Sequence, residues 1–365
     1  MERTIENITQ ILDRVMDPKS GQPITRMKMV QDLNIQDQTI SFTLRITPAH
    51  QQHKSDLNFL CQSLLEENFP GSQVHIHVVQ VGGDIPTPDA NPLAQIKNII
   101  AVASGKGGVG KSTVAVNLAM GLKKLGARVG LLDADVYGPS LPTMLKLQGQ
   151  RPRVEELYGS PRIIPLEAYG VPVISIGNVV DPEQAVVLRG PRLAGIIKQF
   201  FLECNWPELD YLVVDLPPGT GDVQLTLVQT VPVTGAIMVT TPQEVALADA
   251  IKAMNMFLLP NVQVPILGVV ENMSWFTPAE LPDHKYYLFG KGGGEILAKK
   301  AESVLLGLVP LIQGVRESGD DGKPAVLDDL SPAQPYFLRI AQAAAQQIAL
   351  RHDTLDPTRI VSIQS

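Results

Sequence analysis

One short segment constrains the fold of this 365-residue chain more than any other feature. It fits the pattern G-x-x-x-x-G-K-[ST] and consists of Gly105, Lys106, Gly107, Gly108, Val109, Gly110, Lys111 and Ser112. An apolar stretch at residues 98–103 precedes it, and residues 113–124 follow with a helical pattern that ends at Gly126. Glycines let successive backbone N–H groups turn toward one anion, and a helix N-terminus adds partial positive charge. The segment therefore predicts a phosphate-binding loop between a strand and a helix.

Two side chains at the end of this loop predict its chemistry. We expect Lys111 to reach the β- and γ-phosphates of a nucleotide and the Ser112 hydroxyl to ligate Mg²⁺. The competing interpretation is a glycine-rich turn that merely ends in a lysine. The flanking strand and helix disfavour that interpretation, because they are the context in which the motif binds phosphate.

A second lysine, Lys106, directly follows the first glycine and is positioned to point away from its own phosphate cradle. Such a lysine can reach a phosphate across a dimer interface, as an arginine finger does in trans. It can equally be a solvated lysine, since loop lysines are usually exposed. The spacing alone leaves both interpretations open.

Acidic residues follow two further apolar runs. Asp133 and Asp135 come after the first run, and Asp215 comes after the second. Parallel strands place such residues at the carboxyl edge of a sheet, where ligands bind. We expect Asp215 to hold Mg²⁺ through water, with Asp133 as a second magnesium residue and one carboxylate positioning the attacking water. Asp133 could instead cap a helix or a turn. The glycine-rich residues 216–222 are a candidate switch.

The chain divides into two patterns. From residue 96 onward, short apolar runs alternate with helix-length segments, which is typical of a doubly wound α/β domain with a mainly parallel sheet. Before that, two helical and two alternating strand patterns predict a small α+β domain. The expected parts are an α+β domain at 1–85, a Pro/Gly linker at 86–95, a nucleotide-binding domain at 96–350 and a C-terminal tail at 351–365.

Composition excludes several classes of function. A net charge of −7, from 30 Lys+Arg and 37 Asp+Glu, gives no sign of a nucleic-acid binder. No apolar run approaches the roughly 20 residues that span a bilayer, and the opening residues lack a secretory signal pattern. We therefore expect a cytoplasmic protein with no stable membrane association. His75 and His77 share one face of a strand, and a metal pair there competes with an ordinary solvated face.

Several blocks resemble one family. They lie at residues 133–142, 189–191, 206–222, 271–274, 289–293 and 319–324. Together with Lys106 they make the chain similar to the deviant Walker A ATPases and, within that group, to the Mrp/ApbC-type iron–sulfur cluster carriers. The resemblance covers nearly all of residues 96–330. Residues 1–85 resemble the small iron–sulfur assembly-factor domain often fused in front of these ATPases.

The resemblance implies an ATP-hydrolysing homodimer that carries or assembles iron–sulfur clusters and delivers them to apoproteins, with assembly factors as further partners. It implies that Lys106 contacts the nucleotide of the other subunit, that Asp135 activates the attacking water and that Asn272 contacts the adenine. The implied catalytic residues are then Lys106, Lys111 and Asp135. The implied nucleotide site comprises the loop, Thr113 and Asn272. The implied cofactors are ATP and Mg²⁺, and a [4Fe–4S] cluster is doubtful.

The chain departs from this family at the cluster site. The usual carrier has C-P-x-C between the Asn-Met-Ser and Phe-Gly-x-Gly-Gly blocks, so that two chains share one cluster, but residues 274–284 contain no cysteine. No iron–sulfur ligand can therefore be identified. Cluster carriage is either lost, or the cluster is held by a partner or by Cys204 with oxygen or imidazole ligands. Buried packing thiols are the favoured interpretation of both Cys204 and Cys61.

Two other classes of function compete with a cluster carrier. One is a positioning switch of the MinD/ParA type, which dimerises on ATP to bind membrane or DNA. The expected C-terminal helix argues against it, because its apolar residues are diluted by Ala and Gln and few basic residues accompany them. The other is a regulatory protein whose front domain binds a partner while ATP sets the affinity, and the missing cysteines favour this class.

Overall fold

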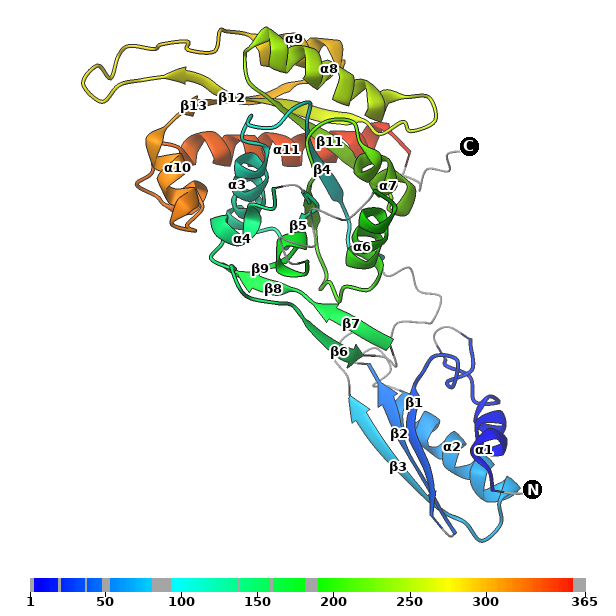
Figure 1. Cartoon of the computed structure of the whole chain (residues 1–365). Coiled ribbons are helices and arrows are strands. Elements are labelled where there is room, and N and C mark those ends of the chain that lie inside the picture. The colour runs from blue at the N-terminus through cyan, green and yellow to red at the C-terminus, as the bar shows by residue number, and fades with distance from the viewer. Residues whose placement is uncertain are drawn as a thin grey trace. The chain divides into compact units, whose positions relative to one another are not determined.

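The computed structural model describes residues 3–18, 21–36, 38–47, 53–80, 93–136, 138–157, 160–180 and 190–356 (Figure 1). The chain divides into two compact units, one with residues 1–91 and 158–160 and the other with residues 92–157 and 161–365. Most of the expected linker at 86–95, and residues 357–365 of the expected tail, lie outside the described residues. The domain limits therefore stay a prediction.

The first unit is a three-stranded sheet with two helices. Its elements are α1 (Ile5–Leu12), β1 (Val30–Gln36), β2 (Thr39–Ile46), α2 (Lys54–Asn68) and β3 (Gln73–Gln80). Strand β2 pairs antiparallel with β1 and parallel with β3. Every second residue of β2 is buried, because the helices cover one face of the sheet. We did not predict β1, since a bulge at Asp32, with φ 52°, breaks its alternation.

The second unit contains an eight-stranded sheet in the order β13-β12-β11-β4-β10-β5-β9-β8. Neighbouring strands are parallel except β8, which pairs antiparallel with β9. The strands are β4 (Ile99–Ser104), β5 (Val129–Asp133), β8 (Leu166–Ala168), β9 (Val171–Ser175), β10 (Tyr211–Asp215), β11 (Gly235–Thr240), β12 (Ile266–Phe276) and β13 (Leu305–Leu311). Strands β6 (Arg153–Leu157) and β7 (Ser160–Ile164) form a separate two-stranded sheet.

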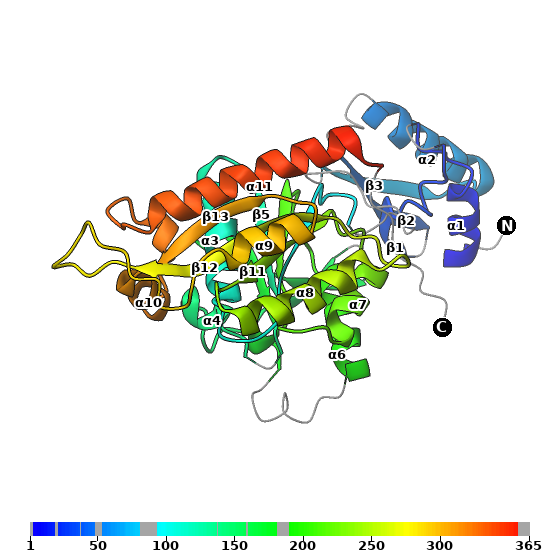
Figure 2. The ribbon, with the colours of Figure 1, turned by 90° about the horizontal axis from the view of Figure 1, so that it is seen from above.

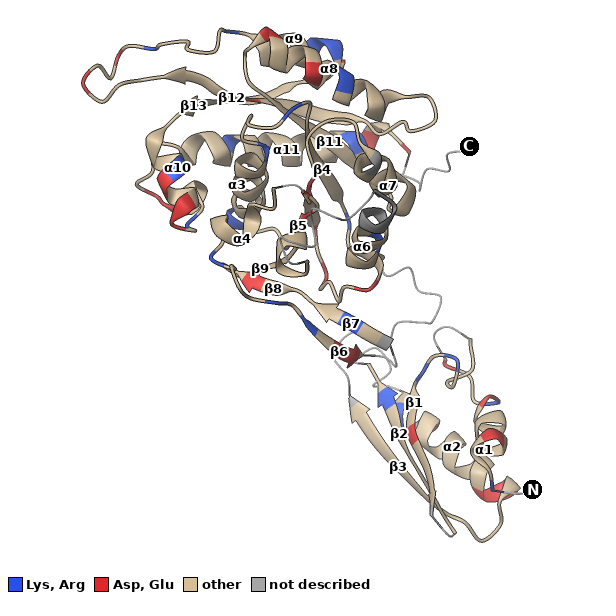
Figure 3. Cartoon of the chain, viewed as in Figure 1, with Lys and Arg blue, Asp and Glu red and all other residues tan. Residues whose placement is uncertain are grey.

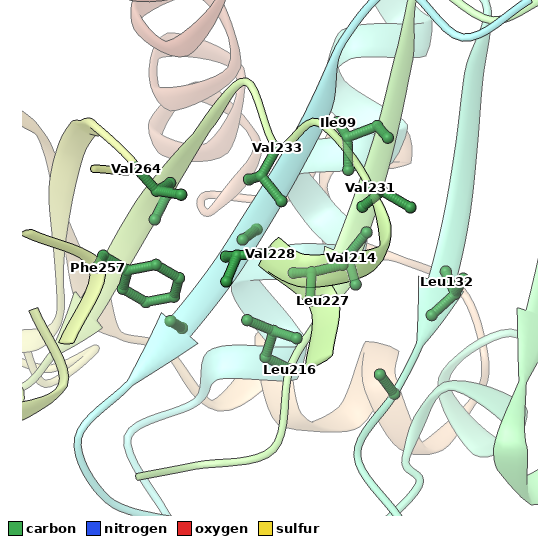
Figure 4. Packing of buried hydrophobic residues seen from close by; sticks show 14 of the residues in the cluster. Ile99, Leu132, Val214, Leu216, Leu227, Val228, Val231, Val233, Phe257 and Val264 are labelled. Atoms are coloured by element: carbon green, nitrogen blue, oxygen red, sulfur yellow. The ribbon is translucent and has the colours of Figure 1, made fainter. Parts of the chain in front are cut away.

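Helices cover both faces of the large sheet (Figures 1 and 2). They are α3 (Lys111–Lys124), α4 (Leu141–Met144), α6 (Gly190–Leu202), α7 (Asp222–Thr230), α8 (Glu244–Leu258), α9 (Gly293–Lys300), α10 (Gln313–Asp320) and α11 (Gln334–Thr354), with 3-10 turns at Ile176–Asn178 and Ala325–Leu327. Residues of α6 to α9 form one buried core, part of which Figure 4 shows, and those of α3, α4 and α11 form the other. The predicted α/β fold class is confirmed.

The central strands are buried on both sides, which explains why their sequences are continuously apolar. All six residues of β4 and all six of β11 are buried. The expected strands all occur, but β12 continues to Phe276, past the end expected at residue 270. Among the described residues, no helix is long and apolar enough to cross a membrane.

Candidate functional site

Three adjacent strands bring the predicted residues to one edge of the sheet. β4 ends at Ser104 directly before the glycine-rich loop, β5 ends at Asp133, and β10, which lies between them, ends at Asp215. Asp133 and Asp215 are register partners. The Ser104 carbonyl accepts a hydrogen bond from the Gly219 N–H over 2.8 Å, which ties the candidate switch to the loop. The carboxyl ends of parallel strands thus place the two carboxylates beside the loop.

The loop ends at Gly110, which has a left-handed φ of 80° and lies directly before α3 at its N-cap position. Lys111 follows as the first residue of the helix, with only 6% of its surface exposed. Its ammonium Nζ lies 2.7 Å from Asp215 Oδ1 and 3.4 Å from Asp135 Oδ2. Nζ also donates to the Ser112 hydroxyl over 3.3 Å. Lys111 therefore joins the loop to both carboxylates in a buried cluster.

Asp133 is fully buried, and its oxygens already have donors from the chain. Oδ2 accepts from the Ser175 hydroxyl over 2.9 Å, and Oδ1 accepts from the Asp135 N–H over 3.0 Å. Burial, and next the nearby charge of Asp215, raise the pKa of Asp133. These contacts fix the backbone that presents Asp135. The predicted contact of Asp133 with magnesium stays a prediction.

Asp215 and Asp135 each retain one buried oxygen, Oδ2 and Oδ1 respectively, that has no hydrogen-bond partner in the described part of the chain. Burial raises the pKa of Asp215, and the Lys111 ammonium opposes that rise. Asp135 and Asp215 both approach the one ammonium of Lys111, so this cluster contains more carboxylates than cations. Carboxylate and hydroxyl oxygens are the ligands that Mg²⁺ prefers, so Asp215 and Ser112 fit a magnesium ion.

Lys106 projects toward the start of α8 and away from the carboxylates. Its Nζ donates to Gln243 Oε1 over 3.4 Å, and Gln243 lies directly before α8, at the N-cap position. The Ser104 hydroxyl donates to the Lys106 carbonyl over 3.0 Å, which holds the loop backbone. The ammonium thus lies outside the cluster around Lys111. This geometry is compatible with both interpretations of Lys106.

Asn272 holds the loop from the neighbouring strand β12. Its side-chain amide donates to the Val109 carbonyl over 2.9 Å. A Cβ added at Gly110 would overlap the Asn272 amide, so this approach requires glycine there. The contact explains how β12 positions the loop. The predicted contact of Asn272 with adenine stays a prediction, as do the roles of Gly107, Gly108 and Thr113.

Gly105 packs directly against the backbone of α8. A Cβ at this position would overlap the Asp249 carbonyl group, whereas a Cβ at Gly107 would meet nothing within 4 Å. We expect Gly105→Ala to lower the free energy of unfolding by roughly 1–3 kcal/mol, because the loop or the helix must move. Gly107→Ala is the matched control and should stay near wild type. Thermal unfolding without nucleotide measures both, and equal stability of the two variants would contradict this packing argument.

Comparison with known proteins adds a family to this geometry. A family model described as NUBPL iron-transfer P-loop NTPase matches residues 95–345, which is more than half of the chain. The chain belongs to this family. A second model, described as iron–sulfur cluster assembly protein, matches residues 5–78 of this P-loop NTPase. Both matches confirm the predicted resemblance, including that of the front domain.

Curated relatives carry one name. The "iron-sulfur cluster carrier protein" of Synechocystis sp. is 45% identical over 350 residues, which cover 95% of this NTPase and 97% of the relative. The protein of the same name from Escherichia coli K12 is 49% identical over 254 residues, covering 70% of this chain and 66% of the relative. These identities extend well beyond the phosphate-binding loop.

Solved structures support the fold. A nucleotide-binding protein from Archaeoglobus fulgidus, in complex with ADP, is 34% identical with a TM-score of 0.55, and the match covers 66% of this NTPase and 94% of that chain. The cell division ATPase MinD from Pyrococcus furiosus is 24% identical with a TM-score of 0.51, covering 68% and 99%. The MinD likeness shows a common fold.

Neither thiol of this NTPase offers an open metal site. Cys61 and Cys204 are both free and buried, as predicted for packing thiols. Burial raises the pKa of Cys61 to about 12 and also raises the pKa of Cys204, so both stay protonated. Within the described ranges, no three His, Cys, Asp or Glu residues form a group that could hold a metal ion. The described thiols therefore do not fit a [4Fe–4S] cluster.

The segment without cysteines forms a hairpin. Phe276 and Tyr286 exchange two backbone hydrogen bonds of 2.8 Å, and we call residues 276–288 the 276–288 hairpin. At its base, Trp275 is 9% exposed and packs edge-on against Tyr336 of α11, with 6.0 Å between ring centroids. The Lys285 ammonium lies 4.2 Å from the centroid of the Trp275 ring. Aromatic and cation–π contacts thus hold the hairpin base against α11.

Sequence reasoning missed three residues of the site. Ser175 holds Asp133, Gln243 contacts Lys106, and Glu271 Oε2 accepts from the Gly294 N–H over 2.7 Å at the start of α9. Ser175 ends β9, so the strand-end rule that found Asp133 could have found it once β9 was recognised. Glu271 lies just beyond residue 270, where the strand was expected to end. Its contact with α9 is visible only in the structure, in which β12 continues to Phe276.

Proposed function

We propose that this chain is an ATP-hydrolysing carrier that takes an iron–sulfur cluster as cargo and delivers it to apoproteins, as a nucleotide-gated homodimer. The observation that carries the proposal is the buried cluster around Lys111, in which a phosphate-binding loop meets Asp135 and Asp215. Such a cluster is suited to binding and hydrolysing a nucleoside triphosphate. The cargo follows from membership of an iron-transfer family and from relatives named as cluster carriers.

Each residue of the cluster has a distinct task in this proposal. The loop N–H groups and Lys111 bind the phosphates, while Ser112 and Asp215 hold Mg²⁺, which neutralises charge on the phosphates when bound. For this, Lys111 exchanges its 2.7 Å contact with Asp215 for contacts with phosphate. Asp135 orients a water and accepts its proton, and Lys106 stabilises the charge that develops in the site of the second copy.

The two thiols cannot hold the cargo while they are buried. The ligands would come from a second protein that supplies thiolates, or from Cys204 after a rearrangement that exposes it. Assembly factors and apoproteins are the partners that the family suggests. The front unit, which matches an assembly-protein model, is the part we assign to partner binding.

Anaerobic reconstitution tests the cargo. The full-length chain is incubated with iron and sulfide, alone and with a thiolate-bearing scaffold protein, and then separated by gel filtration. We expect iron, sulfide and cluster absorbance to elute with the chain, and their transfer to an apoprotein to speed up with Mg·ATP. Cys204→Ser and Cys61→Ser distinguish a rearranged thiol from ligands on the scaffold. Retained ATP hydrolysis without bound iron under either condition would overturn carriage and leave a cluster-free switch.

A further inference from the structure

The candidate switch, residues 216–222, is anchored to the sheet at two points. The Leu216 N–H donates to the Val102 carbonyl over 3.1 Å, and the Leu216 side chain lies in the buried core of Figure 4. The Gly219 N–H donates to the Ser104 carbonyl, directly before the phosphate-binding loop. The two residues between these points are prolines, which have no N–H to donate. Their backbone can therefore be held only by groups that donate to its carbonyls.

The side chain of Gln224 supplies such donors. Its amide Nε2 donates to the Pro217 carbonyl over 2.8 Å and to the Gly219 carbonyl over 3.1 Å, from the first turn of α7. The side chain is fully buried, and residues 223–230 of this helix carry no charge (Figure 3). A glutamine amide offers two N–H donors without a charge. It therefore holds both carbonyls and adds no cation that would compete with the magnesium expected at Asp215.

The oxygen of the same amide shows that Gln224 is more than a helix cap. In a capping box, a glutamine at the third position of a helix accepts from the N-cap N–H, here that of Gly221. A Cβ added at Gly221 would lie 3.6 Å from Gln224 Oε1, so the two groups are neighbours. Yet Oε1 is buried without a hydrogen-bond partner among the described residues, which costs free energy. The contacts of this side chain therefore serve the loop and not the helix.

We propose that Gln224 is a positioning residue for ATP hydrolysis, which fixes residues 216–222 and, through their backbone, the Asp215 carboxylate. The inference rests on the hydrolytic site of the proposed function and adds a residue outside the cluster around Lys111. Asp215 directly precedes the loop, and a misplacement of about 1 Å in such a site can slow the reaction by about 10²-fold. The phosphate-binding loop is held by Asn272, so ATP binding should not depend on Gln224.

Gln224→Met tests the proposal, because methionine has a similar length and donates no hydrogen bond. We expect the turnover number for Mg·ATP to fall roughly tenfold to a hundredfold, while KM and the dissociation constant of ATP stay within about twofold of wild type. Steady-state phosphate release and isothermal titration with the full-length chain measure these quantities. Gln229→Met is the matched control, since Gln229 is exposed on the same helix, and it should hydrolyse ATP as wild type does.

A second control separates positioning from a loss of stability. Val231 is fully buried at the opposite end of α7 (Figure 4). Val231→Ala should lower the temperature of thermal unfolding, because it leaves a cavity, but keep the wild-type turnover for each molecule that binds ATP. If Val231→Ala lost turnover in the same proportion as Gln224→Met, Gln224 would act through stability alone, and the inference would be overturned.

Hydrogen exchange measures the loop directly. The amides of residues 216–222 should exchange faster in Gln224→Met than in wild type, whereas Gln229→Met should match wild type. Unchanged exchange in this segment, wild-type turnover of Gln224→Met, or an equal loss of ATP affinity and turnover would each overturn the inference and leave the proposed function standing. If wild type itself does not hydrolyse Mg·ATP, the proposed function fails, and the inference with it.

Discussion

Lys111→Ala lowers the affinity for ATP by about 100-fold or more, since each charged hydrogen bond to phosphate contributes about 1.5 kcal/mol and the ammonium makes at least two. The loss has a second source in this chain. In the wild-type chain the Lys111 ammonium lies within 3.4 Å of both Asp135 and Asp215. Without it, no positive charge offsets these two carboxylates when the phosphates approach. Isothermal titration with ATP, with and without Mg²⁺, measures the effect.

A surface lysine provides the control for this prediction. Lys252 has 74% of its side chain exposed and pairs with Asp249 on the outside of α8. Lys252→Ala should bind ATP with wild-type affinity, because an exposed ion pair contributes little. Circular dichroism should show that Lys111→Ala keeps its fold. An unchanged dissociation constant for folded Lys111→Ala would refute the assignment of the loop.

Lys106→Ala leaves ATP binding intact but slows hydrolysis by about 10³-fold or more, the effect of removing a cationic finger that acts in trans. Its ammonium contacts Gln243 and lies outside the cluster around Lys111, so its loss leaves the phosphate cradle in place. Single-turnover phosphate release, measured over a range of protein concentrations, gives the rate. Wild-type turnover at every concentration would identify Lys106 as an ordinary solvated lysine.

Mixing two variants separates a trans role from a cis role. Asp135→Asn alone should bind ATP and hydrolyse it about 10²- to 10⁴-fold more slowly, because the group that accepts the proton from water is gone. In a mixed dimer, the Asp135→Asn copy supplies Lys106 to the site of the Lys106→Ala copy, which retains Asp135. Hydrolysis should therefore recover in the mixture. A mixture as inactive as its components would rule out the trans contact.

Local pattern explains what could be predicted from the sequence. The loop and the aspartates at strand ends follow from neighbouring residues, because a buried parallel strand reads as an apolar run and its carboxyl end faces the ligand. Ser175 and Gln243 escaped prediction, since their importance comes from contacts with residues 42 and 137 positions away. Short strands such as β8, with three residues, carry too little pattern to recognise.

The 276–288 hairpin could be predicted from the sequence only in part. The absence of cysteine at residues 274–284 was visible in the sequence, but not that β12 runs on to Phe276 or that Trp275 packs on Tyr336. An aromatic contact with α11 joins segments about sixty residues apart and has no local signature. Likewise, only the structure shows that Asp135 and Asp215 each keep one buried oxygen without a hydrogen-bond partner among the described residues.

Strand β12 connects the phosphate-binding loop with the 276–288 hairpin. Asn272 holds the Val109 carbonyl of the phosphate loop, and four residues later the same strand enters the hairpin at Phe276. Between these residues β12 bulges, because four steps along β12, from Asn272 to Phe276, lie opposite only two steps along β13, from Val309 to Leu311, and Met273 there has a φ of 57°. We therefore expect a shift of the loop, when phosphate enters or leaves, to reach the hairpin through this bulged part of one strand. We expect a spectroscopic probe attached to the hairpin to change its signal when nucleotide binds, without touching the nucleotide.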